Sequence, residues 1–138
     1  MTTLSLDYGK KNVGLAIGDS TSRAITPLKA INNIQSKDNL WNRLDKTVYE
    51  WKPDDLLLGL PTTLDESQHP LKIEICNFGE EISKRYNLEV NFIDEYLSSH
   101  AAAIEKKKRQ NKKFDLDSLA AAFILETWFD CFDNEERC

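Results

Sequence analysis

The sequence predicts an α/β fold built on a mixed β-sheet that carries helices on both faces. Three segments with the alternating hydrophobicity of strands come first, and helix-like and strand-like segments then alternate along the chain. Alternation of this kind favours parallel strands joined by right-handed crossovers. With 138 residues, of which 41% are hydrophobic and 30% charged, the chain is long enough to bury a full core. We expect a single domain over residues 1–138.

The first three strands are expected to form the antiparallel part of the sheet. Residues 4–7 and 13–18 show strand-like alternation, and the turn at 9–12 between them indicates a hairpin. A third extended segment spans 24–34 and contains Pro27, which is typical of an edge strand or a bulge. One face of the second strand carries only small residues, namely Gly14, Ala16 and Gly18. A substrate or a helix could approach closely there, and helix packing is our expectation.

The rest of the chain alternates between helices and strands. A helix is expected between Ser36, which suits an N-cap, and Pro53. Its apolar positions recur at helical spacing and are all expected to pack in the core: Leu40, Leu44, Val48 and Trp51. The later elements expected are a strand at 56–60, a helix at 71–86, a strand at 88–93, a helix that begins near residue 98, and a helix from 116 to about 132.

Acidic residues stand at the ends of three of these elements. Asp7 closes the first strand, Asp94 and Glu95 close the last strand, and Asp117 lies in the first turn of the last helix. In the parallel part of a sheet the carboxyl ends of the strands share one edge, where ligands bind. If the first and last strands are neighbours, Asp7 and Glu95 lie close together at that edge. Asp117 can then close the cluster.

Three such carboxylates would repel one another unless a cation lay between them. Carboxylate oxygens suit Mg²⁺ or Mn²⁺, and a trio can hold two ions about 3.5–4 Å apart, an arrangement used to hydrolyse phosphodiester bonds. The pattern therefore predicts Asp7, Glu95 and Asp117 as catalytic residues and metal ligands. Structural roles are the alternative. Asp7 suits a turn, Glu95 a solvated strand end and Asp117 a helix N-terminus.

Positive charge is concentrated in one segment of an otherwise acidic chain. The net charge is −5, from 18 basic and 23 acidic residues, yet residues 106–113 read KKKRQNKK. The basic side chains of this segment are candidates for binding nucleic-acid phosphates: Lys106, Lys107, Lys108, Arg109, Lys112 and Lys113. Lys10 and Lys11, in the hairpin turn beside Asp7, are further candidates. A solvated surface segment is the alternative in each case.

Four motifs carry a resemblance to a known family. They read LDYGKKNVGLAIGD, LLLGLPTTLDES, VNFIDEYLSS and DLDSLAAAFILET, in that order. In sequence and spacing the chain resembles the bacterial pre-16S rRNA nuclease family, which is also described as Holliday-junction-resolvase-like, from Leu4 to about Phe129. The resemblance implies a ribonuclease H-like fold with a five-stranded mixed sheet, three strands antiparallel and then two parallel. It places the acids of the family's site at Asp7, Glu95 and Asp117.

The activity that the resemblance implies is that of a metal-dependent endonuclease acting on structured nucleic acid. Its expected role is to process the 5′ end of pre-16S rRNA in ribosome biogenesis, and its expected cofactor is Mg²⁺ or Mn²⁺, with two ions bound. Junction DNA is the alternative substrate, and a non-catalytic protein that binds nucleic acid or ribosomes is the alternative class. An ATPase of the actin and sugar-kinase type needs two domains, for which the chain is too short.

Features that would direct the chain to a membrane or to an oxidising compartment are not found in the sequence. No apolar stretch approaches the roughly 20 residues needed to span a bilayer, and no basic region precedes the first apolar residues. Cys76, Cys131 and Cys138 show the spacing of neither a disulfide framework nor a zinc site. We therefore expect a cytoplasmic protein without a membrane partner that acts as a monomer or a homodimer.

Overall fold

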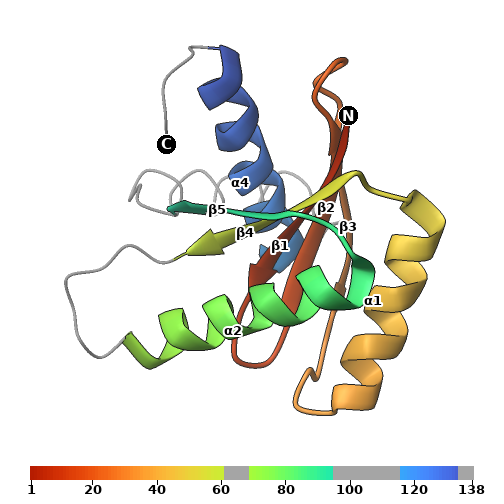
Figure 1. Ribbon diagram of the computed structural model, residues 1–138, viewed down its shortest axis with the longest axis vertical. Helices are drawn as coiled ribbons and strands as arrows, with labels where there is room; N and C mark the ends of the chain where they lie inside the picture. The colour runs from red at the N-terminus through yellow and green to blue at the C-terminus, as the bar shows by residue number, and fades with distance from the viewer. Residues whose placement is uncertain (61–68, 95–115, 134–138) are drawn as a thin grey trace.

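The computed structural model describes residues 1–60, 69–94 and 116–133. Within these ranges the strands are β1 (Thr2–Tyr8), β2 (Val13–Asp19), β3 (Ile25–Ile31), β4 (Asp55–Leu60) and β5 (Val90–Asp94). The helices are α1 (Lys37–Trp51), α2 (His69–Tyr86) and α4 (Leu116–Asp133) (Figure 1). The helix expected to begin near residue 98 lies outside the described residues. Every element expected within them is present.

The five strands form one mixed sheet in the order β3-β2-β1-β4-β5. β1 and β2 pair antiparallel, as do β2 and β3, whereas β1 pairs parallel to β4 and β4 pairs parallel to β5. This is the expected arrangement of three antiparallel strands followed by two parallel ones. β3 lies at one edge of the sheet and contains Pro27, which stands opposite Ala16 of β2 and suits an edge strand.

The condition under which Asp7 and Glu95 would lie on adjacent strands is not met: the first and last strands are not neighbours, because β4 lies between β1 and β5. The burial of the two strands accounts for this order. β4 is buried along residues 55–59, which suits a strand with partners on both sides and helices on both faces. β5 is shorter and mostly half-buried or exposed, which suits an edge.

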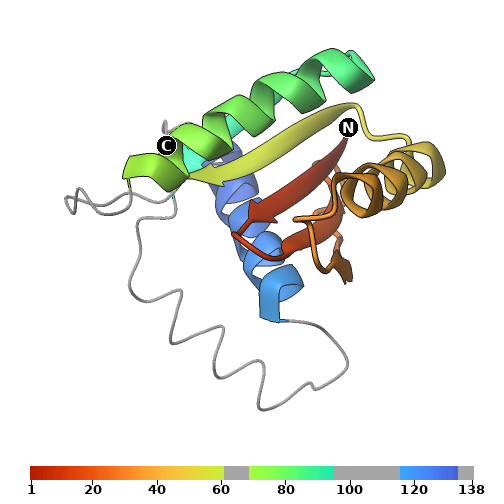
Figure 2. The ribbon, with the colours of Figure 1, turned by 90° about the horizontal axis from the view of Figure 1, so that it is seen from below.

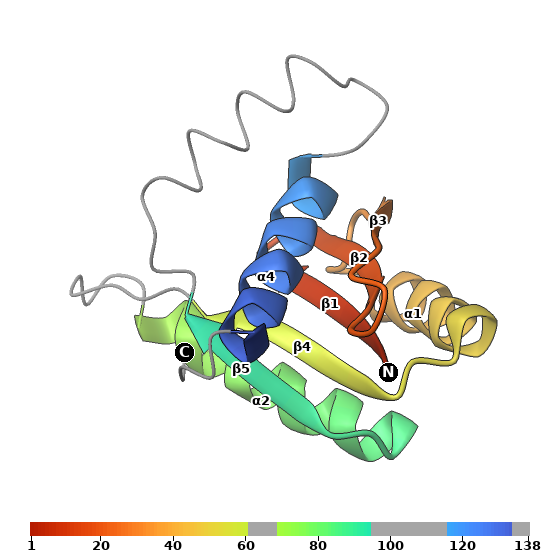
Figure 3. The same ribbon diagram turned by 90° about the horizontal axis from the view of Figure 1, so that it is seen from above.

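The helices divide between the two faces of the sheet. α1 and α2 cover one face and α4 lies across the other, as the views from below and from above show (Figures 2 and 3). The larger core cluster lies under α1 and α2 and includes Leu4, Leu6 and Tyr8 of β1. The smaller cluster lies under α4 and includes Leu57 and Phe129.

α4 approaches β2 closely because the strand has no large side chains on that face. A methyl group built on Gly14 would lie 1.9 Å from the carbonyl oxygen of Asp117. A methyl group built on Gly18 would lie 2.7 Å from Cδ2 of Leu125. The prediction that this face receives a helix is therefore confirmed, and both ends of the contact depend on glycine.

Helix α1 begins as expected, since the Ser36 side chain accepts a hydrogen bond from the Asn39 amide at 3.4 Å. It ends at Lys52, whose backbone is left-handed with φ 46°. Trp51, the last residue of the helix, is 44% exposed, so the expectation that it packs in the core is wrong. Trp51 is the last residue of the helix, and the chain turns directly after it at Lys52. Across the described ranges, no helix combines the length and hydrophobicity needed to cross a membrane.

Candidate active site

Asp7 lies near the end of the central strand of the sheet. β1 pairs with β2 on one side and with β4 on the other, and Asp7 stands directly opposite Gly14 of β2. Because side chains alternate along a strand, Asp7 shares its face with Ser5, which hydrogen-bonds to α4, and not with Leu6 in the core under α1 and α2. The carboxylate of Asp7 is half-buried on the face that α4 covers.

The residue after Asp7 anchors the end of the strand from the opposite face. The ring of Tyr8 is buried against Phe78, with 4.6 Å between the ring centroids. Its hydroxyl donates a hydrogen bond to Oε1 of Glu74 in α2 at 3.2 Å. Burial, reinforced by the charge of Glu74, raises the pKa of Tyr8 to about 12, so the hydroxyl stays protonated and keeps this bond. The strand end that carries Asp7 is thereby fixed to α2.

Asp117 reaches the same place from the last helix. It occupies the first turn of α4, half-buried, where a carboxylate is favoured by the helix dipole. The main chain of Asp117 lies directly on Gly14, the residue opposite Asp7. Residues paired across two antiparallel strands have Cα atoms roughly 4.5–5.5 Å apart, so the main chain of Asp117 lies over a residue that is one strand spacing from Asp7. The structure therefore brings two of the three predicted acids together.

The hydroxyls of two buried serines hold α4 in this position. Oγ of Ser118 accepts a hydrogen bond from the backbone amide of Leu15 at 3.4 Å. Ser5 donates a hydrogen bond from Oγ to the carbonyl oxygen of Ala121 at 2.8 Å. Sequence reasoning missed both serines. The sequence does place a small polar residue, Ser5, within the first strand. The structure shows that this position is fully buried.

The third predicted acid, Glu95, lies outside the described residues. Its neighbour Asp94 ends β5 and is exposed, opposite Leu60 at the end of β4. Because β1, β4 and β5 are parallel, all three strands end at the same edge, with β4 separating Asp94 from the strand that carries Asp7. The expected shared edge is present, but the direct adjacency of the two strands is not.

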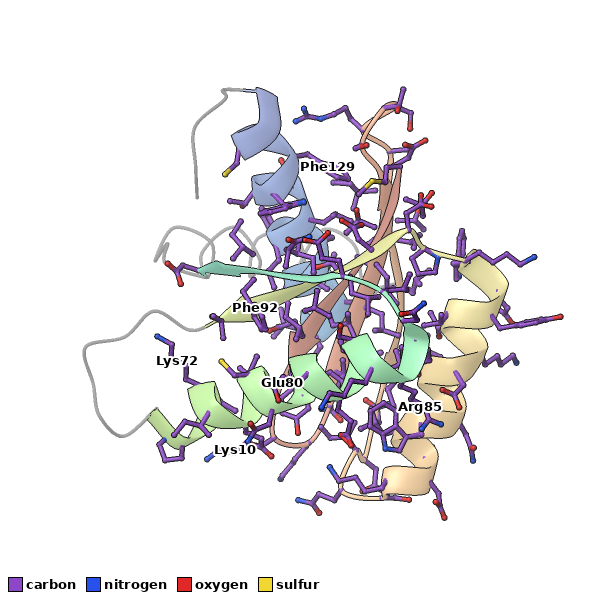
Figure 4. The ribbon with its side chains drawn as sticks, in the orientation of Figure 1. Lys10, Lys72, Glu80, Arg85, Phe92 and Phe129 are labelled. Atoms are coloured by element: carbon purple, nitrogen blue, oxygen red, sulfur yellow. The ribbon has the colours of Figure 1, made fainter. Side chains whose placement is uncertain are left out.

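The predicted phosphate-binding residues divide in the same way. Lys10 and Lys11 are exposed in the turn between β1 and β2, which is closed by a hydrogen bond from the Gly9 amide to the Asn12 carbonyl at 2.9 Å. Lys10 lies at the end of the molecule away from Phe129, beyond the strand end that carries Asp7 (Figure 4). The basic residues between 106 and 113 lie outside the described residues.

Asp7 and Asp117 have the chemistry of a hard-cation site. Carboxylate oxygens are the ligands that small divalent cations prefer, and two of them lie on one face of the sheet here. Among residues 1–60, 69–94 and 116–133, no three His, Cys, Asp or Glu side chains are grouped so that they could hold a metal ion. Two of the predicted ligands are thus in the described part of the structure, and the third position, Glu95, is not.

A sheet of three antiparallel and two parallel strands, with helices on both faces, is the ribonuclease H-like fold of the junction-resolving nucleases that the chain resembles in structure. The chain's sheet and helices match those of Thermus thermophilus RuvC in complex with a Holliday junction substrate, at 13% identity and a TM-score of 0.63 over 96% of both chains. They also match the fowlpox virus Holliday junction resolvase, at 20% identity and a TM-score of 0.56 over 96% of this chain and 99% of that one.

The chain belongs to the RuvX family, described as Holliday junction resolvase, whose family model matches residues 1–131. Relatives named "Putative pre-16S rRNA nuclease" support this assignment. The one from Dechloromonas aromatica is 36% identical over 94% of this chain and 90% of its own length. The one from Paraburkholderia phytofirmans is also 36% identical, over 99% of this chain and 92% of its own length.

Membership of this family makes the chain a nuclease, a hydrolase that acts on phosphodiester bonds. Nucleases of this class bind nucleic acid and generally use divalent metal ions. The expected family, fold and enzyme class are therefore confirmed. The non-catalytic binding protein and the two-domain ATPase are not the class to which the chain belongs.

Proposed function

We propose that this nuclease processes the 5′ end of pre-16S rRNA, with Asp7, Glu95 and Asp117 as its catalytic residues and metal ligands. The observation that carries the proposal is the contact between Asp117 and Gly14, the residue opposite Asp7. It joins an acid at position 7 to an acid at position 117 across one face of the sheet.

The proposed substrate is taken from relatives that align with nearly the whole chain. Those named for pre-16S rRNA are 36% identical and cover at least 94% of this chain. The two junction resolvases of known structure are only 13% and 20% identical to this chain. A likeness at that level supports the shared fold but not a shared substrate. Pre-16S rRNA is made and trimmed in the bacterial cytoplasm, so the proposal places the enzyme there, as a single domain over residues 1–138 that acts as a monomer or a homodimer.

The proposed cofactor is Mg²⁺ or Mn²⁺, with two ions bound. Asp7 and Asp117 supply the hard oxygen ligands that these ions prefer, and Glu95 would complete the set. When bound, two such ions supply an activated water and stabilise the leaving oxygen at phosphorus. The chain's own contribution is to hold the carboxylates in place. Lys10, Lys11 and the basic residues of 106–113 would hold the phosphates on either side of the cleaved bond.

The proposal is tested by cleavage of a structured pre-16S rRNA fragment and of a four-way DNA junction, each with Mg²⁺, Mn²⁺ or EDTA. We expect the wild type to cut the RNA with either ion and not with EDTA. Asp7→Asn and Asp117→Asn should each lower the rate about 100-fold or more, because each loses a metal ligand. Asp19→Asn is the matched control. It also ends a strand of the same hairpin, but at the opposite edge of the sheet, where it pairs with the N-terminal amine.

The outcomes separate the parts of the proposal. Preferential cutting of the junction would replace the RNA substrate by junction DNA, which the family description favours. Cleavage that survives either Asp7→Asn or Asp117→Asn would refute the assigned site. A loss of the same size in Asp19→Asn would show that the loss reflects folding and not metal binding.

A further inference from the structure

We propose that Gly14 and Ser118 are positioning residues that set the spacing between the Asp7 and Asp117 carboxylates, and with it the affinity and selectivity for metal ions. We use the name α4 seat for the contact between β2, at Gly14 and Leu15, and the first turn of α4, at Asp117 and Ser118. The inference rests on the proposed function, because it concerns the same two ligands. It adds a role for residues that carry no ligand atom themselves.

The first step is the fit at Gly14. A Cβ atom there would lie 1.9 Å from the carbonyl oxygen of Asp117, 2.2 Å from its carbonyl carbon and 2.8 Å from the amide nitrogen of Ser118. All three are main-chain atoms, so no side-chain rotation relieves the overlap. Separations below 3.0 Å are essentially never found, and ordinary contact begins at 3.4 Å. A methyl group at Gly14 therefore displaces the first turn of α4 by between 1.1 and 1.5 Å.

The second step is that this displacement falls on Asp117 and not on the whole helix. One turn further along, the carbonyl of Ala121 accepts the hydrogen bond from Ser5, and both residues are fully buried. Beyond it, Leu125 and Phe129 are buried in the smaller core cluster. These contacts hold the body of α4 on the sheet. The first turn, whose own link to β2 is the bond from the Leu15 amide to Ser118, is the part that must move.

The third step is the tolerance of the metal. Mg²⁺ requires near-ideal octahedral geometry with ligands at 2.0–2.1 Å, whereas Ca²⁺ accepts six to eight ligands at 2.3–2.6 Å in flexible arrangements. A shift of at least 1.1 Å in one ligand's main chain is several times the tolerance of an octahedral site. The affinity for Mg²⁺ and Mn²⁺ should therefore fall more than the affinity for Ca²⁺. The α4 seat thus fixes the separation of the two carboxylates that ions with strict octahedral geometry require.

Gly18 provides a matched control in the same strand. It lies on the same face of β2 and under the same helix, four residues from Gly14. The atoms that a Cβ would meet there include Cδ2 of Leu125 at 2.7 Å and Cε2 of Phe129 at 3.1 Å, which are the ends of side chains. Rotation of these side chains can absorb part of a methyl group. Gly18→Ala therefore perturbs helix packing without moving the turn that carries Asp117.

The experiment measures metal binding to the purified full chain. Mn²⁺ binding is followed by the paramagnetic resonance signal of the free ion and Ca²⁺ binding by calorimetry, with folding checked by circular dichroism. We expect Gly14→Ala to raise the Kd for Mn²⁺ about tenfold or more, the range found when residues supporting a metal ligand are removed. The Kd for Ca²⁺ should rise less than about threefold, and Gly18→Ala should change neither Kd by more than about twofold.

A longer ligand should restore the site. Asp117→Glu adds one carbon–carbon bond of about 1.5 Å, close to the displacement that Gly14→Ala imposes. We expect Asp117→Glu to weaken Mn²⁺ binding in the wild type and to strengthen it in Gly14→Ala, so the two substitutions are not additive. If Gly14→Ala does not fold, Ser118→Ala loosens the same turn without added bulk. It should raise the Kd for Mn²⁺ about threefold relative to Gly18→Ala.

Each result decides the inference. Unchanged Mn²⁺ binding in Gly14→Ala, or in Ser118→Ala where the first variant does not fold, overturns it. Equal losses in Gly14→Ala and Gly18→Ala also overturn it, because the effect is then one of packing alone. Failure of the proposed function is recognised separately, since Asp7→Asn and Asp117→Asn would then bind Mn²⁺ as the wild type does.

Discussion

Replacing Phe129 with alanine should lower the free energy of unfolding more than the same change at Phe92, which packs on the opposite face of the sheet. Phe129 is 2% exposed and belongs to the small cluster under α4. The guanidinium of Arg23 lies 5.8 Å from the centroid of its ring and also pairs with Oδ1 of Asp130 at 2.8 Å. Phe92 is the matched position: it packs on Gly79 of α2 but is 38% exposed (Figure 4).

The burial of the two rings sets the size of the effect. Truncation of a buried phenylalanine costs about 3–5 kcal/mol of unfolding free energy. Because Phe129 is almost completely buried, we expect a value in that range for Phe129→Ala. Phe92 has about six tenths of its surface buried, so Phe92→Ala should cost about 2–3 kcal/mol. Unfolding entropy near 2.1 cal/mol/K per residue is about 0.3 kcal/mol/K for this chain, so the Tm should fall by roughly 10–17 °C and 6–10 °C respectively.

The assay is urea unfolding of both variants, followed by far-ultraviolet circular dichroism, with the Tm measured in parallel. A loss in Phe129→Ala that does not exceed the loss in Phe92→Ala would refute the reasoning. It would show that the packing of α4 contributes less to stability than the packing of α2, despite the deeper burial of Phe129.

Two buried or paired carboxyls should make stability depend on pH in opposite ways. Asp55, 4% exposed and hydrogen-bonded to Thr3 at 2.5 Å, has its pKa raised above the ordinary 3.8 chiefly by burial. Because the folded state binds that proton more tightly than the unfolded state, the free energy of unfolding falls as pH rises through the raised pKa. Asp55→Asn should abolish this fall, which urea titrations from about pH 4 to about pH 8 would measure. Hydrogen bonds from Arg85, at 2.8 and 2.7 Å, and from Tyr86 lower the pKa of Asp45 below its ordinary value of 3.8. The ionised Asp45 therefore stabilises the folded state above pH 3.8, and this contribution is lost as pH falls through the lowered pKa. Asp45→Asn should cost about 1 kcal/mol at neutral pH and much less near pH 2, and an equal cost at both would contradict the assignment.

Much of the sheet could be predicted from local pattern. Pro27 indicated an edge strand, and β3 is one. The small residues of β2 indicated a covering helix, and α4 is that helix. The apolar run at 56–60 indicated a strand, and β4 is that strand, buried along residues 55–59. Each of these features depends on a residue's own shape or hydrogen-bonding capacity, which is why the sequence displays it directly.

The order of the strands and the surroundings of the site could not be read in the same way. Strand order could not be read from residues 90–94 alone, because it depends on which distant segments pair with one another. The exposure of Trp51 depends on where the helix ends, at Lys52, and the spacing of apolar residues does not predict that end. The role of Ser118 depends on a main-chain approach between segments about 100 residues apart, for which no periodicity exists.

The hydrogen bonds that dock α4 span most of the chain, and this has a consequence for when the enzyme becomes active. The bond between Ser5 and Ala121 joins residues 116 positions apart, and that between Leu15 and Ser118 joins residues 103 positions apart. During synthesis at about 5–20 residues per second, Asp7 is made on the order of 5–20 s before Asp117. A ribosome carrying the growing chain therefore bears one acid of the proposed site and not the other. With the proposed site, the nascent chain stays incomplete as a nuclease until its last helix has been translated and has docked.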